Sequence, residues 1–85
     1  MNGESMLKQA AAVVANRREA YGDPTASMSA IASRWSITLG RTVTPSQVAL
    51  CLIDLKLARL AHDPRHLDSM VDIAGYAAVL REVSR

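Results

Sequence analysis

The sequence is poor in several residue types that stabilise larger folds. Its 85 residues include no Phe, one Trp, two Tyr and a single cysteine, Cys51. A lone cysteine cannot form an internal disulfide, so we expect Cys51 to be a buried, inert thiol. The apolar run 48–53 is too short to span a membrane, and the N-terminus lacks a signal-peptide pattern. We therefore expect a cytoplasmic protein.

The chain also lacks a large excess of charge of either sign. Ten basic and eight acidic residues leave a net charge of +2, which is too weak to indicate duplex nucleic acid as a partner. Only two of the ten basic residues are Lys, namely Lys8 and Lys56. The guanidinium of Arg is a planar fork suited to phosphate or carboxylate. A GC-rich coding bias toward Arg explains this composition equally well.

No alternation typical of strands is present, and the fold prediction is all-α. Thr44, Pro45 and Gln47 form a capping-box pattern at a helix start. Gly22 and Gly40 are expected to end helices. The predicted single domain, residues 1–85, has helices at about 5–20, 24–39, 45–62 and 67–83, with Ser5 and Asp23 as caps of the first two.

A chain of this size is expected to be stabilised by association with a second copy. A domain this small buries only about 60% of its unfolded surface, so the monomer would be marginal. Residues 45–62 are hydrophobic on almost all sides, which predicts a central helix buried almost all round. We expect a homo-oligomer, a dimer or higher.

Three carboxylates on the last two helices are candidate metal ligands. Asp68 and Asp72 lie one helical turn apart on one face. Mg²⁺ is bound by one or two carboxylates together with ligand phosphates, so Mg²⁺ is the candidate cofactor. Asp54 lies in the most apolar helix and needs a partner from another helix, a metal or solvent. The alternatives are that Asp68 is a helix cap and that Asp72 pairs with an Arg.

Basic and aromatic residues near these carboxylates are candidate ligand-binding groups. Lys56 and Arg59 share a helical face and could grip a phosphate, although a solvated helix edge explains Lys56 as well. Tyr21 precedes a helix N-terminus and could stack on a base, or could pack at its helix end. The remaining candidates for ligand contact are Arg65, Trp35 and Tyr76. A zinc site at His62 and His66 is not expected, because Pro64 breaks the helix between them.

Several longer stretches resemble a known group of proteins. They are Glu19-Ala20-Tyr21-Gly22-Asp23-Pro24, Ile31-Ala32-Ser33-Arg34-Trp35-Ser36, Leu39-Gly40, Val43-Thr44-Pro45, Leu55-Lys56-Leu57-Ala58-Arg59-Leu60 and Asp72-Ile73-Ala74-Gly75-Tyr76-Ala77. They resemble a small helical family found in phages and prophages, which is in turn similar to the all-α MazG-like nucleotide pyrophosphohydrolases. The resemblance implies a four-helix MazG-like bundle and, for a phage protein, the cytoplasm of a bacterial host.

The same resemblance implies a nucleotide ligand and leaves open whether it is cleaved. MazG-type enzymes hold Mg²⁺ with two acidic pairs, and the second pair is Glu-x-x-Asp. The nearest match is Ser69-Met70-Val71-Asp72, with Ser where the family has Glu, and the first pair is missing. This departure favours a protein that binds or sequesters a nucleotide. The alternatives are a Mg²⁺-dependent pyrophosphohydrolase, with Asp54, Asp68 and Asp72 as ligands, and an interaction module without a small-molecule ligand.

Overall fold

Four helices make up the fold. The structure is a computed structural model that describes residues 1–84. The helices are α1 (Gly3–Tyr21), α2 (Pro24–Leu39), α3 (Pro45–His62) and α4 (Leu67–Val83). No strand occurs in residues 1–84, so the all-α prediction is confirmed. The bounds of α2, α3 and α4 coincide with those expected from the sequence, and α1 is slightly longer at both ends.

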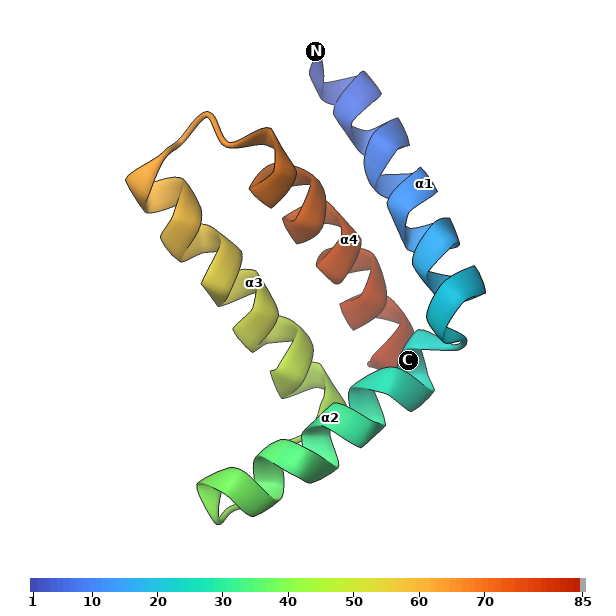
Figure 1. The fold of residues 1–85 in the computed structure, drawn as a ribbon, viewed down its shortest axis with the longest axis vertical. Coiled ribbons are helices and arrows are strands. Elements are labelled where there is room, and N and C mark those ends of the chain that lie inside the picture. The colour runs from blue at the N-terminus through green and yellow to red at the C-terminus, as the bar shows by residue number, and fades with distance from the viewer. Residues whose placement is uncertain (85) are drawn as a thin grey trace.

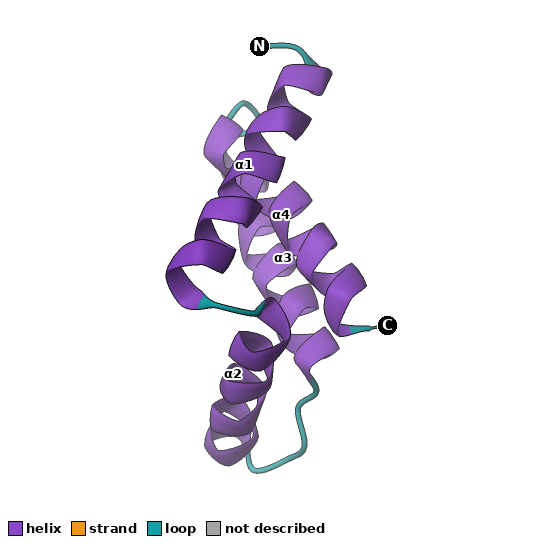
Figure 2. Cartoon of the chain, turned by 90° about the vertical axis from the view of Figure 1, so that its right-hand side faces the viewer, coloured by secondary structure: helices purple, strands orange, loops and turns teal. Residues whose placement is uncertain are grey.

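Helix α4 lies at the centre of the arrangement (Figure 1). It runs beside α3 on one side and beside α1 on the other, and α2 crosses the lower ends of α3 and α4. The view from the side shows α1 in front of α4 and α2 at the opposite end from the N-terminus (Figure 2). Groups from α1 and α3 can therefore reach the same residue of α4 from opposite sides.

The helix ends follow the local signals only in part. Thr44 and Gln47 form the expected capping box at the start of α3, and Gly40 ends α2 in the left-handed conformation at φ 68°. The expected cap Ser5 is wrong, because the side chain of Asn2 accepts the N–H of Ser5. Asp68 is not a cap either, because the cap of α4 is His66.

The hydrophobic core is small and lies where α2 meets α3 and α4. Met28, Ala32 and Val48 form its buried centre. Half-buried apolar side chains pack around this centre: Ile31, Trp35, Val43, Leu52, Val79 and Val83. Separate small residues, among them Ala10 and Val71, are buried where the other helices pair. The core thus consists mainly of small side chains, which allows close helix packing but buries little apolar surface.

Helix α3 is less buried than its sequence predicts. Leu50, Leu55 and Leu57 are exposed, and so is Cys51. The expectation of burial was wrong for all four residues, because α2 and α4 cover only one side of α3.

None of the helices in residues 1–84 combines the length and the hydrophobicity that a membrane-spanning helix needs.

Candidate functional site

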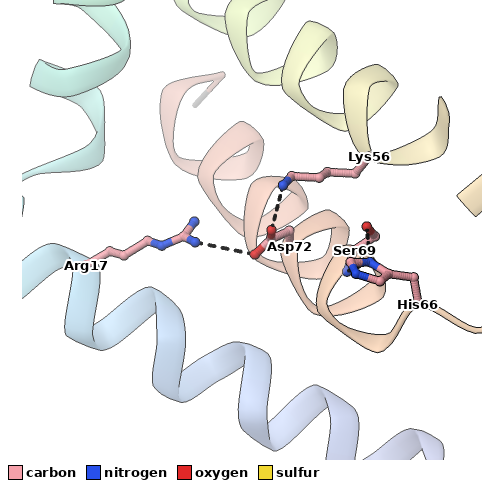
Figure 3. Close-up of polar contacts among 5 residues, drawn as sticks. All are labelled: Arg17, Lys56, His66, Ser69 and Asp72. Carbon is pink, nitrogen blue, oxygen red and sulfur yellow. Dashed lines mark hydrogen bonds and ion pairs between the residues drawn. The ribbon is translucent and has the colours of Figure 1, made fainter. Parts of the chain in front are cut away.

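A buried carboxylate on α4 joins three helices. Asp72 Oδ2 lies 2.9 Å from Nζ of Lys56 on α3. The other oxygen, Oδ1, accepts a long hydrogen bond of 3.4 Å from the guanidinium of Arg17 on α1. Figure 3 shows Arg17 reaching Asp72 from α1 and Lys56 reaching it from α3. We call these three residues the ion triad, and its geometry bears out the interpretation that Asp72 pairs with an Arg.

Burial makes the ion triad a strong electrostatic feature. Asp72 is only 5% exposed, and the side chain of Lys56 is 14% exposed. A carboxylate this far from water must be paired, because an isolated buried charge costs several kcal/mol. The triad holds two cations and one anion, which leaves one positive charge in excess. That excess lies toward Arg17, whose side chain is half-exposed.

A pocket lies beside Arg17, between α1, α2 and α4, with Leu52 of α3 in its wall. Its volume is about 490 Å³, within the range of about 300–1,000 Å³ that small-molecule sites occupy. Arg17, Arg18, Tyr21 and Tyr76 supply its polar and aromatic walls. The apolar lining includes Val14, Met28, Ile31, Leu52 and Val79. We call it the α1 pocket.

Ion pairs and a ring contact hold the two arginines that line the α1 pocket. The Arg17 guanidinium carbon lies 5.9 Å from the centre of the Tyr76 ring, within the range of a cation–π contact. Arg18 forms an ion pair with Glu82 near the end of α4. Both arginines are about half-exposed at their side chains. Each therefore keeps donors that an incoming anion can reach.

A second, more open pocket of about 430 Å³ lies where α3 turns into α4. It contains Arg59, His62 and His66 together with Leu55, Ala58 and Asp63. The ring nitrogen Nδ1 of His66 accepts the backbone N–H of Ser69 at 3.3 Å and lies 2.7 Å from its hydroxyl. His66 thus acts as the cap of α4, and Arg59 is the cation that this pocket offers.

The three candidate metal ligands are not brought together. Asp54 is exposed on α3, Asp68 is exposed in the first turn of α4, and Asp72 is buried. Among residues 1–84 no three His, Cys, Asp or Glu side chains lie close enough to hold a metal ion. The carboxylate of Asp72 is already bonded to two cations, so this donor set does not fit Mg²⁺.

The candidate ligand-binding residues are divided among different parts of the fold. Tyr21 and Tyr76 line the α1 pocket, and Arg59 lines the second pocket. Tyr21 is 77% exposed, so it does not pack at its helix end. Lys56 turns inward to Asp72 and does not line the second pocket beside Arg59. Trp35 packs on the core, and Arg65 is exposed in the α3–α4 turn.

Arg17 and Arg18 are the residues that the sequence analysis missed. Arg17 lies seven residues after the buried Ala10 and three after Val14, so it continues the apolar stripe of α1. A charged residue on such a stripe is a signal that it meets a buried opposite charge. Arg18 lies one position further along α1 and off this stripe, so its spacing gives no comparable signal. Its partner Glu82 is 64 residues away in the sequence.

Comparison with known proteins places this helical domain in a phage-associated class. Residues 5–84 match the family described as a domain of unknown function, DUF6378. The chain belongs to this family. It is 38% identical over 81 residues to the Gene 55 protein of Mycobacterium phage L5, covering 93% of this chain and 52% of the relative.

A second relative gives the same picture. The Gene 55 protein of Mycobacterium phage D29 is 32% identical over 81 residues, covering 94% of this chain and 54% of that protein. The chain thus spans about half the length of these curated relatives. No solved structure matches the chain. The phage association expected from the sequence is confirmed, and the link to MazG-like enzymes stays a prediction.

Proposed function

We propose that this domain binds a phosphate-bearing nucleotide in the α1 pocket. The observation that carries the proposal is the lining: two half-exposed arginines and two tyrosines surround one apolar hollow of about 490 Å³. Phosphate needs charged donors, and a base needs a flat apolar surface. Such a pocket offers both within one small space.

Each group has a distinct part in this proposal. Arg17 and Arg18 meet the phosphate, because a guanidinium donates two hydrogen bonds in the plane of an oxyanion. Tyr21, which is exposed at the mouth, stacks on the base. Tyr76 holds Arg17 from behind through its ring. The N-terminal end of α2, which also lines the pocket, adds the positive end of a helix dipole.

The arrangement of charges favours binding over cleavage. A Mg²⁺-dependent pyrophosphohydrolase needs carboxylates that are free to hold the metal against the phosphates. Asp72 instead neutralises Lys56 and part of Arg17. We therefore propose that the nucleotide is held intact, and that the phosphate contacts expected at Lys56 and Arg59 belong to Arg17 and Arg18.

Calorimetric titration with a panel of linear and cyclic nucleotides tests this proposal. Tyr21→Ala and Arg18→Ala are each expected to weaken the best ligand by about tenfold or more, equivalent to about 1.4 kcal/mol. Arg34→Ala is the matched control, because Arg34 is an exposed arginine on α2 outside the pocket. We expect it to bind like the unmodified chain.

The chemical state of the nucleotide after incubation distinguishes binding from hydrolysis. Chromatography of the mixture after incubation with Mg²⁺ should return the nucleotide unchanged. Release of pyrophosphate that Asp72→Asn abolishes would support the hydrolase instead. Absence of binding at millimolar nucleotide, or equal weakening by Arg34→Ala, would refute a nucleotide site in the α1 pocket.

A further inference from the structure

The outer side of α3 carries a mainly apolar surface that no other part of residues 1–84 covers. Seven residues at helical spacing face away from α2 and α4, and all are exposed. We call them the outer stripe: Gln47, Leu50, Cys51, Asp54, Leu57, Ala58 and Ala61. Gln47 lies at one end and Asp54 in the middle, and the five apolar members span about 17 Å of helix length.

The chain exposes more surface, and is more extended, than is expected for a compact monomer of its mass. The accessible surface is 5811 Å², against about 4,900 Å² expected for a compact monomer of this size. The radius of gyration is 13.5 Å, against about 12 Å expected for 85 residues in one compact domain. The excess area is about 900 Å², close to the roughly 800 Å² that each partner buries in a standard interface.

We propose that the outer stripe is the contact surface between two copies of this chain. The excess area is similar to what one partner contributes to a dimer, and the buried core of a single copy is small, so that a second copy would add apolar burial. On α2, by contrast, the large exposed apolar residues Ile37 and Leu39 lie near the end of the helix and point to different sides of it.

The position of the charged residue Asp54 favours one orientation and register of the two α3 helices. A two-fold axis along α3 would make the two helices parallel and set the Asp54 carboxylates side by side, which is unfavourable. A two-fold axis perpendicular to α3 makes the helices antiparallel, with the same surface used on both copies. An axis at Asp54 would bring two carboxylates together in an apolar surface, which is unfavourable. An axis between Leu57 and Ala58 instead places Asp54 opposite Ala61 of the second copy, one residue from its His62. Small residues at Ala58 and Ala61 let the two helices approach closely.

Sedimentation velocity over a wide concentration range tests the interface. The unmodified chain should sediment as a dimer, or as an assembly built from dimers. Leu57→Glu, at a side chain that is 49% exposed, should halve that mass without loss of helical circular dichroism. Leu39→Glu is the control, because Leu39 is 62% exposed and lies off the stripe on α2. It should leave the mass unchanged.

Oxidative cross-linking tests the register. In a Cys51→Ser background, Ala58→Cys lies beside the proposed axis, where two Cα atoms can come within the roughly 4.4–6.8 Å of a disulfide. It should form a covalent dimer in mild oxidant. Ala61→Cys would lie about 10 Å from its copy along the helix axes and should not cross-link.

Three results would overturn the proposal. The first is a monomer at every concentration, which would leave the stripe to a different partner. The second is an assembly that Leu39→Glu disrupts and Leu57→Glu does not. The third is cross-linking through residue 61 but not through residue 58. The proposal does not rest on nucleotide binding, because the outer stripe and the α1 pocket share no residue.

Discussion

The two sides of α3 accommodate charged residues in opposite ways. On the inner side, Lys56 is nearly buried and its ammonium group meets Asp72 at 2.9 Å. On the outer side, Asp54 is exposed among apolar neighbours and has no ion pair within residues 1–84. The difference shows that the position of a charged residue relative to α4, and not its type, decides whether it takes part in a buried ion pair. Substitutions on the two sides should therefore differ sharply in their effects.

The largest contrast is expected between the two aspartates. Asp72→Ala leaves the ammonium of Lys56 in a mostly buried place without its anion, which should lower the free energy of unfolding by about 3 kcal/mol. Asp54→Ala should change it by less than about 0.5 kcal/mol. Urea unfolding followed by circular dichroism, at a concentration where the chain is monomeric, measures both. Similar losses for the two variants would contradict the contrast.

The apolar side chains of the same helix should show a smaller contrast. Val48 is fully buried against the core, and Leu50 is exposed two residues later. Val48→Ala removes two buried methyl groups and should cost about 2 kcal/mol. Leu50→Ala should cost less than about 0.5 kcal/mol in the monomer. The same unfolding experiment decides this, and a larger loss for Leu50→Ala would show that the outer side is covered within one chain.

The smallest effect is expected when one of the two cations of the ion triad is removed. Lys56→Met fills the same space with an apolar side chain and leaves Asp72 bonded to Arg17 at 3.4 Å. The loss should be about 1 kcal/mol, well below that of Asp72→Ala. The double variant Lys56→Met, Asp72→Leu should recover most of the stability lost in Asp72→Ala. If Lys56→Met were as harmful as Asp72→Ala, Arg17 would not be a real partner.

The helices could be predicted from the sequence because their signals are local. The capping box at Thr44 and the glycine stops lie within a few residues of the bond that they influence. Two caps were assigned to the wrong residue, because each of these helix starts offers two polar side chains that can act as a cap: Asn2 or Ser5, and His66 or Asp68. Which residue becomes the cap depends on where the first helical turn forms, and the sequence pattern alone does not determine that position.

The site could be predicted only where one helix contains the information. Asp72 was a candidate because it lies one helical turn from Asp68 on one face of the helix, and pairing with an Arg was one of the alternatives. That the partners are Lys56 and Arg17 depends on how three helices pack, and Arg17 is 55 residues away from Asp72. The burial of α3 was overestimated for the same reason. A helix that is apolar all round does not reveal which of its sides its own chain will cover.

The order of the ion triad along the chain has a consequence for how the domain assembles. Lys56 and Asp72 belong to neighbouring helices joined by the short turn 63–66, so an α3–α4 hairpin can form their ion pair by itself. Contacts between close segments form at low entropic cost, whereas α1 must arrive from the far end of the chain. If α1 packs after this hairpin, Arg17 meets a carboxylate that Lys56 has already neutralised. Separation of α1 from α4 would likewise leave Asp72 paired with Lys56, so no uncompensated charge would remain in the interior.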